Sequence, residues 1–198
     1  NFIAGLSKFK GKDIRINTGE EADEVEKQLL AGKFIVKSVK YGKRKPKPYA
    51  PFTTSSLQQD ASIKLGFQTK KTMQIAQQLY EGIDVKGIGT RGLITYLRTD
   101  SVRVSSVAKE SAAEYITAHF GAEYSHSFSN KNKDIQDAHE AIRPADVTLE
   151  PEAIRDSLTP DQFKLYNLIW NRFVASQMSP AEFDTVSVSI DNNDYEFR

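Results

Sequence analysis

The sequence contains no cysteine, which excludes disulfide bonds and thiolate metal sites. No apolar run is long enough to span a bilayer, and none resembles a secretory leader. The formal net charge is only +1 over 198 residues, so the large positive charge of many nucleic-acid-binding proteins is missing. With 39% hydrophobic and 27% charged residues, the composition is that of a folded globular protein rather than a disordered one.

Several catalytic signatures are also missing. There is no Gly-x-x-x-x-Gly-Lys-Ser/Thr phosphate loop, so use of ATP is not indicated. There is no Cys/His metal cluster, no Asp-x-Asp-x-Glu run and no Gly-x-Ser-x-Gly elbow. The acidic set nearest to a metal site is Asp191, Asp194 and Glu196. Its spacing favours a hairpin turn over metal binding.

The charges that are present are unevenly placed. Acidic residues crowd the segment from Glu20 to Glu26, and basic residues crowd another short segment. A basic patch steers a polyanion more strongly than the net charge suggests, but the same run fits a solvated linker equally well. The basic residues are Lys37, Lys40, Lys43, Arg44, Lys45 and Lys47.

Capping and periodicity predict most of the helices. Thr159-Pro160-Asp161-Gln162 is a capping box with proline at the first helical position. The helix at 70–81 has Met73, Ala76, Leu79 and Tyr80 as its apolar face. Glycines that follow apolar stripes mark helix ends. The predicted helices cover about 20–31, 54–65, 70–81, 105–119 and 160–177.

Strands are predicted on both sides of the helical block. Residues 2–17 form a hairpin, and strands follow at 34–39 and 185–190, with a short apolar strand at 93–97 inside the block. Residues 82–92 are glycine-rich and are predicted to be a loop. Tyr41 to Pro51 contains three prolines among lysines and is interpreted as a linker.

The predicted fold class is therefore α+β with more than one domain. A mostly helical domain at 47–179 is inserted into a discontinuous, sheet-containing domain made of residues 1–46 and 180–198. The chain begins without methionine and stops in a predicted strand, so we expect it to be a fragment of a longer protein.

Gly92 to Ser101 contains the first chemical candidate. If Leu93–Arg98 is a strand, Tyr96 and Arg98 share a face, because side chains alternate with period two. A phenol has an ordinary pKa of about 10 and needs activation to act as a nucleophile. A neighbouring guanidinium favours the phenolate and binds phosphate. The pair is the minimum for tyrosyl attack on a phosphodiester, although a strand tyrosine is more often a packing residue.

The second candidate is the segment from Gln136 to Pro144. His139 and Arg143 share a face if this segment is helical. His139 has the chemistry to donate to a phosphate oxygen or to carry a proton, and Arg143 to bind phosphate. The competing interpretation is a solvated turn with a surface histidine.

Three stretches together resemble the type IA family of DNA topoisomerases, to which bacterial topoisomerase I belongs. Pro51-Phe52-Thr53-Thr54-Ser55-Ser56-Leu57-Gln58-Gln59 is similar to the family's entry into its active-site domain. Gly92 to Ser101 is similar to its active-site tyrosine motif, and His139-Glu140-Ala141-Ile142-Arg143-Pro144 to its histidine motif. The order and separations of the three stretches also match, over nearly the whole chain.

The resemblance implies a mechanism. Tyr96 would attack one DNA strand and become joined to the 5′ phosphate, and the enzyme would pass another strand and religate without ATP. Arg98 would stabilise the scissile phosphate and His139 would contact backbone phosphate. The residues expected to support DNA binding in the same cleft are Thr99, Asp100 and Arg143.

The resemblance also implies what lies outside this sequence. The family needs Mg²⁺ held by an acidic N-terminal domain, which this chain lacks, so the fragment alone is expected to be inactive. The implied partners are single-stranded or negatively supercoiled DNA and that missing domain, in a cytoplasmic, nucleoid-associated monomer. Two alternatives stay open: a DNA-binding or gate module in which Tyr96 is inert, and the topoisomerase module of a reverse gyrase.

Overall fold

A computed structural model describes residues 2–125 and 139–198. The chain divides into two compact units. The sheet unit comprises Asn1–Pro46 and Ala181–Arg198, and the helical unit comprises Lys47–Pro180. The described residues combine five α-helices with two antiparallel sheets, which agrees with the predicted α+β class.

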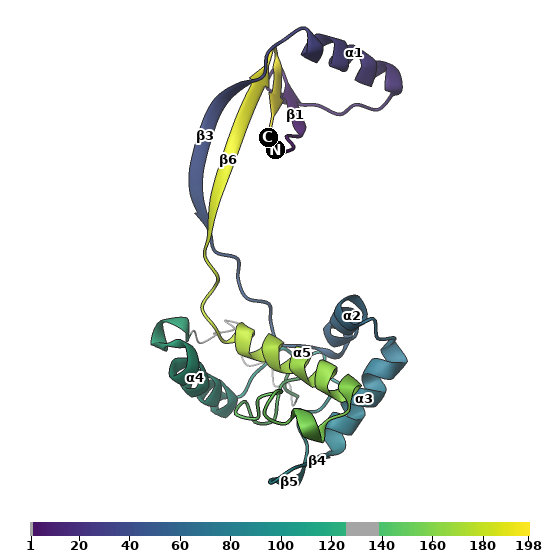
Figure 1. The fold of residues 1–198 in the computed structure, drawn as a ribbon, viewed down its shortest axis with the longest axis vertical. Coiled ribbons are helices and arrows are strands. Elements are labelled where there is room, and N and C mark those ends of the chain that lie inside the picture. The colour runs from purple at the N-terminus through teal and green to yellow at the C-terminus, as the bar shows by residue number, and fades with distance from the viewer. Residues whose placement is uncertain (1, 126–138) are drawn as a thin grey trace. The chain divides into compact units, whose positions relative to one another are not determined.

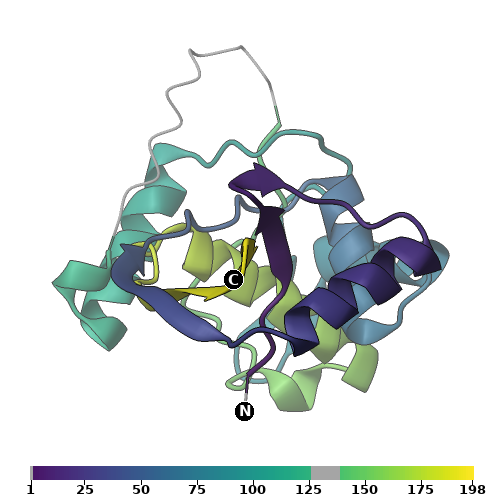
Figure 2. The same ribbon diagram turned by 90° about the horizontal axis from the view of Figure 1, so that it is seen from above.

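The sheet unit contains an antiparallel sheet of five strands in the order β2-β1-β7-β6-β3. Its core comes from Ile190, Tyr195 and Phe197, with partly buried side chains of β1 and α1 against them. Figure 1 and Figure 2 show α1 beside the short strands. The elements are β1 (Leu6–Phe9), β2 (Lys12–Asp13), α1 (Gly19–Leu30), β3 (Ile35–Arg44), β6 (Phe183–Asn192) and β7 (Tyr195–Phe197).

The turn between β6 and β7 holds the end of α1. Asn192 Nδ2 donates to the carbonyl oxygen of Leu29 at 2.9 Å, and Asn193 Nδ2 donates to that of Gln28 at 2.9 Å. Helix ends leave carbonyls without partners, so the two asparagines stabilise the helix terminus. A Cβ at Gly32 would collide with both amide side chains, so this contact depends on glycine. The predicted turn at 191–194 is confirmed at Asn193 and Asp194.

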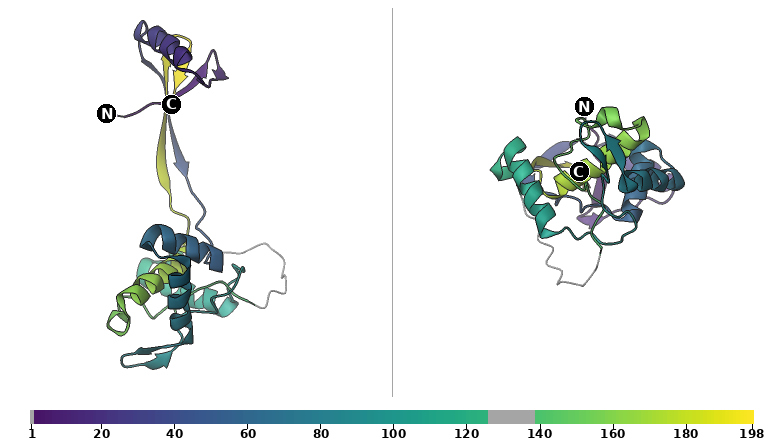
Figure 3. Two further views of the ribbon diagram at one scale, coloured as in Figure 1. Left: turned by 90° about the vertical axis from the view of Figure 1, so that its right-hand side faces the viewer. Right: turned by 90° about the horizontal axis from the view of Figure 1, so that it is seen from below.

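The predicted linker begins too early. β3 continues through Arg44, whose partner in β6 is Phe183. Pairing with β6 satisfies the backbone over this stretch, and only from Pro46 onward do the prolines remove donors. Figure 3 shows β3 and β6 running side by side. The basic run is partly paired within the sheet unit: Lys37 lies 2.9 Å from Asp191, and Lys45 lies 2.5 Å from Glu182.

The helices of the helical unit begin within about one residue of the predicted starts, and the capping box predicted at Thr159 is confirmed. Thr53 and Thr159 each form a capping box, at the start of α2 and α5. Gly66 ends α2 in the left-handed conformation with φ of 67°. The elements are α2 (Thr54–Leu65), α3 (Thr69–Glu81), β4 (Ile83–Val85), β5 (Gly89–Arg91), α4 (Ser106–Phe120), α5 (Pro160–Ser176) and the 3₁₀ turns η1 (Ala122–Tyr124) and η2 (Arg155–Ser157).

Helix α5 is the central element of this unit's core. Its side chains Leu165, Tyr166, Ile169 and Phe173 are buried against α2, α3 and the irregular segments. These side chains pack α5 into the core of the helical unit. In the described part of the chain, no helix is both long and apolar enough to cross a membrane.

Polar contacts tie the helices to one another. Asp60 of α2 accepts hydrogen bonds from Arg172 Nη2 of α5 at 2.6 Å and from Lys64 Nζ at 2.8 Å. Burial acts to raise the pKa of Asp60, but these two hydrogen bonds outweigh it and hold the pKa below its ordinary value. On α4, burial and a 2.8 Å hydrogen bond to Glu150 raise the pKa of Tyr115 to about 12.

The stretch predicted to be a loop at 82–92 contains a hairpin. β4 pairs with β5, with Val85 opposite Gly89, and Figure 3 shows the hairpin projecting from the helical unit. Ile83 and Val85 alternate as in a strand, while Gly87 and Gly89 have φ of 79° and 96° and so allow the tight turn. The density of glycines concealed this short alternation.

Candidate active site

Three segments far apart in sequence lie against one another through backbone bridges. Ile94 forms an isolated antiparallel bridge with Pro144, and Phe52 forms one with Ile142. The amide of Ile142 donates to the carbonyl of Phe52 at 2.8 Å. The three stretches singled out from the sequence therefore meet in one place in the helical unit.

The start of α2 holds the segment that follows Tyr96. The amide of Thr54 donates to the carbonyl of Thr99 at 2.8 Å, and its hydroxyl donates to the carbonyl of Leu97 at 2.8 Å. The same hydroxyl accepts from the amide of Thr99 at 2.9 Å. One side chain thus fixes the backbone on both sides of residue 98.

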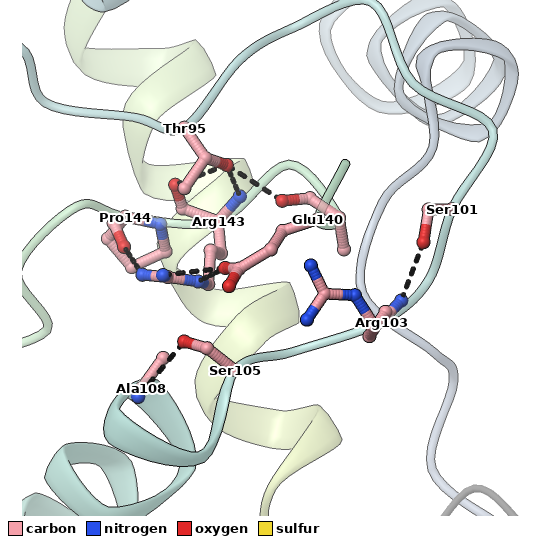
Figure 4. Close-up of polar contacts among 9 residues, drawn as sticks. Thr95, Ser101, Arg103, Ser105, Ala108, Glu140, Arg143 and Pro144 are labelled. Carbon is pink, nitrogen blue, oxygen red and sulfur yellow. Dashed lines mark hydrogen bonds and ion pairs between the residues drawn. The ribbon is translucent and has the colours of Figure 1, made fainter. Parts of the chain in front are cut away.

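A second threonine joins the tyrosine segment to the histidine segment. The Thr95 hydroxyl donates to the carbonyl of Ala141 at 2.7 Å and accepts from the amide of Arg143 at 3.0 Å (Figure 4). The amide of Thr95 donates to the carbonyl of Arg143 at 3.0 Å. Because Thr95 immediately precedes Tyr96, these bonds fix the nucleophile candidate relative to residues 141–143.

Residues 93–97 do not form the predicted strand. Outside the single bridge at Ile94, this stretch is irregular, so strand alternation does not explain how Tyr96 and Arg98 lie. The backbone groups that a strand would pair are instead bonded to α3, to Thr54 and to the 141–145 segment; the amide of Leu93, for example, donates to the carbonyl of Leu79 at 2.7 Å. These partners are distant in sequence, so local pattern gave no sign of them.

Tyr96 is the exposed member of this irregular segment. Its side chain is 41% exposed, whereas Leu93, Ile94 and Leu97 are buried. Its ring lies near two other rings, with centroid distances of 5.6 Å to Tyr80 and 5.6 Å to His139. The structure thus brings Tyr96 and His139 together, with the phenol at the surface where a polymer strand has access.

The histidine segment is extended, not helical. Residues 139–144 have no helical assignment and are held by the bridges at Ile142 and Pro144. The helical spacing that linked His139 to Arg143 therefore does not apply. Gln136, Asp137 and Ala138, which began this candidate segment, lie outside the described residues.

Arg143 has internal partners. Its Nη2 and Nε lie 2.7 and 2.8 Å from Glu140 Oε2, and its Nη1 donates to the carbonyl of Pro144 at 2.9 Å (Figure 4). Its side chain is only 13% exposed. A guanidinium with these partners stabilises the extended 139–144 segment, and removing either member would leave a poorly solvated charge.

The remaining candidates differ in exposure. Arg98 and Asp100 are exposed beside Tyr96. Thr99 is buried, and its hydroxyl oxygen accepts from the amide of Ser101 at 3.1 Å. Next to the extended 139–144 segment lies a cavity of about 280 Å³. Its lining includes Arg143, Arg91 and Ser105 at the start of α4.

Sequence reasoning missed two features of the site. Tyr80 was assigned to the apolar face of its helix, yet it is 39% exposed and its ring contacts Tyr96. A position at the end of the helix, just before Gly82, was the available signal. The hydroxyls of Thr54 and Thr95 were also missed, because their partners lie more than 40 residues away.

The site does not include a ready metal centre. Within the described ranges, no three His, Asp or Glu side chains are grouped so that they could hold a metal ion. The chemistry that this chain offers is therefore an exposed phenol, an adjacent imidazole and nearby cations, on a backbone fixed by long-range hydrogen bonds.

Comparison with known proteins gives the family. The sequence model of the DNA topoisomerase family matches residues 3–198. Full-length topoisomerase I from Thermotoga maritima is similar in structure, with 41% sequence identity and a TM-score of 0.78 over 98% of this chain. The chain belongs to the type IA DNA topoisomerase family, as its three motifs indicated. It spans 31% of the length of the Thermotoga protein.

Proposed function

We propose that this chain carries the DNA-cleaving tyrosine of a type IA topoisomerase. The observation that supports this most directly is the contact between Tyr96, exposed at the surface, and His139 across a centroid distance of 5.6 Å. Thr54 and Thr95 fix the backbone around it. A nucleophile held at a fixed place beside a polar partner is what covalent catalysis requires.

In the proposed reaction, the Tyr96 phenol oxygen attacks a backbone phosphorus of single-stranded DNA. The bond from phosphorus to the 3′ oxygen breaks, the DNA 5′ end remains on the tyrosine, and the phenol proton ends on the released 3′ hydroxyl. Religation is the reverse step. The phosphotyrosine bond conserves the energy of the broken linkage, so the cycle needs no ATP.

Arg98 and His139 have separate roles in this proposal. Arg98 is exposed two residues after the nucleophile, and its fixed charge would stabilise the phosphate as charge develops. His139 would bind a phosphate oxygen next to the attacking phenol. Arg143, which is held by Glu140, would support the extended segment that carries His139 instead of contacting DNA directly.

Magnesium would be held outside this chain, because the described residues offer no grouped ligands for it. We therefore propose that the 198-residue chain alone does not relax supercoiled DNA. Gel electrophoresis of a negatively supercoiled plasmid incubated with the purified chain and Mg²⁺ tests this directly. Relaxed topoisomers that are absent with the Tyr96→Phe chain would contradict the proposal of inactivity.

The nucleophile is tested in a chimera in which these 198 residues replace the matching segment of the Thermotoga maritima enzyme. Labelled single-stranded DNA should form a denaturant-resistant complex with the chimera and none with its Tyr96→Phe variant. Tyr49→Phe, at an exposed ring in the same unit, is the matched control and should leave complex formation intact. A complex of equal yield with Tyr96→Phe would assign the chain to the alternative, a gate module with an inert tyrosine.

A further inference from the structure

Tyr80 is a second aromatic neighbour of Tyr96, besides His139. It is the penultimate residue of α3. The two rings meet edge to face, with centroids 5.6 Å apart and planes at 66°. His139 lies at the same centroid distance with its plane tilted by 32°. The ring of Tyr96 thus has two ring contacts, one with a side chain from α3 and one with a side chain from the extended 139–144 segment.

Tyr80 is held firmly by the backbone around it. The amide of Leu93 donates to the carbonyl of Leu79 at 2.7 Å, and the amide of Gly82 donates to that of Gln78 at 3.1 Å. The chain also returns directly over Tyr80: a Cβ added at Gly92 would lie 2.7 Å from the Tyr80 carbonyl oxygen. The Tyr80 backbone is therefore fixed relative to the segment that carries Tyr96.

The two ring contacts matter because Tyr96 lies on irregular backbone and its ring is partly in solvent. A phenol there loses rotamer freedom only if neighbouring rings restrict it. Edge-to-face pairs provide such a restraint, and the energy usually measured for one corresponds to about a three- to tenfold change in an equilibrium. Contacts with the Tyr80 ring and with the His139 imidazole would keep the phenol oxygen directed at the DNA strand.

We propose that Tyr80 is a positioning residue for Tyr96, acting through its ring and not through its hydroxyl. The inference rests on the proposed function, because it concerns the same nucleophile. It assigns a role to the end of α3, which the three sequence motifs do not include. Tyr80 has no part in the bond-making step, and the DNA need not touch it.

The test is single-turnover cleavage of labelled single-stranded DNA by the chimera, with DNA affinity measured separately under non-cleaving conditions without Mg²⁺. Tyr80→Ala should lower the cleavage rate at saturating DNA about fivefold and leave the dissociation constant unchanged. Tyr80→Phe, which keeps the ring, should restore the rate. Tyr124→Ala, at another exposed tyrosine of the same unit, is the control and should cleave at the parent rate.

Three results would overturn the inference. The first is a parent-like rate in Tyr80→Ala. The second is weaker DNA binding with an unchanged rate at saturation, which would make Tyr80 a stacking platform for a base. The third is a Tyr80→Phe variant as slow as Tyr80→Ala, which would assign the effect to the hydroxyl. Failure of the proposed function is separate, since only then would Tyr96→Phe still form the covalent complex.

Discussion

Replacing Thr95 by valine tests how the tyrosine and histidine segments are joined. Valine keeps the shape of threonine but removes the hydroxyl. The carbonyl of Ala141 then loses a 2.7 Å donor, and the amide of Arg143 loses a 3.0 Å acceptor. The backbone hydrogen bond from Thr95 to Arg143 remains available, so the variant should fold.

The cost follows from the two groups left without partners. A buried polar group that loses its partner costs about 1–3 kcal/mol, and because Thr95 is only partly buried, water offsets part of the loss. We expect the free energy of unfolding of the helical unit to fall by about 2 kcal/mol. For a unit of this size, that lowers the melting temperature by roughly 6–8 °C.

Tryptophan fluorescence is the appropriate assay, because the chain has one tryptophan and it lies in α5 of the helical unit. Thr95→Ser keeps the hydroxyl and should lose clearly less stability. Thr117→Val, at an exposed helical threonine, controls for the chemical change itself. A melting temperature within about 1 °C of the parent would refute the claim that this hydroxyl joins the segments.

Three further predictions concern stability. Asp60 has a lower pKa in the folded than in the unfolded chain. Its ionisation therefore stabilises the fold fully above the unfolded pKa of about 4, and this contribution is lost as pH falls through the folded pKa. In urea unfolding, Asp60→Asn should lower the free energy of unfolding by about 2 kcal/mol at pH 7 and by less at pH 3. Tyr115, with its pKa raised to about 12, contributes stability that is complete below about pH 10 and lost toward pH 12. Absorbance at 295 nm should show the same number of tyrosines titrating near pH 10 in the parent chain and in Tyr115→Phe, and one fewer in the variant would contradict the raised pKa. Gly32→Ala should destabilise the sheet unit by about 1–3 kcal/mol through the collision of its Cβ with Asn192. The unit should be cut faster by protease, while the melting temperature followed by tryptophan fluorescence stays unchanged. Gly19→Ala, whose Cβ meets nothing within 4 Å, is the control, and equal proteolysis of the two variants would rule the collision out.

Much of the helical unit was predictable, because its signals are local. At Thr53 and Thr159, the threonine side chain bonds the backbone three residues later, and the side chain three residues later bonds back to the threonine backbone. Gly66 ends α2 in a conformation that favours glycine. Such features are written in four or five consecutive residues. The α+β class followed from the order of these elements along the chain.

The sequence singled out residues for the candidate site but did not predict their geometry. The motifs identified Tyr96 and His139, and the structure places their rings together. The strand at 93–97 was wrong because that backbone bonds to Thr54, Leu79 and Arg143 instead of to a neighbouring strand. These partners are set by the tertiary fold, which local periodicity does not encode.

The same limit explains Tyr80 and Arg143. A tyrosine at helical spacing is usually a core residue, and only the returning chain at Gly92 places Tyr80 beside Tyr96. An arginine in the histidine motif suggests DNA contact, but its pairing with Glu140 three residues earlier depends on an extended segment, where the sequence left a helix and a turn open.

The central claim, that Tyr96 is the nucleophile, is tested most directly by finding which residue carries DNA after cleavage. The chimera is trapped on a short single-stranded oligonucleotide, digested with nuclease and trypsin, and its peptides are analysed by mass spectrometry. Trypsin cuts after Arg91 and Arg98, so residues 92–98 form a peptide in which Tyr96 is the one tyrosine. A 5′-phosphonucleotide should be found on that peptide, attached to Tyr96. A nucleotide on the peptide of residues 72–86, which contains Tyr80, or on any other peptide would contradict it.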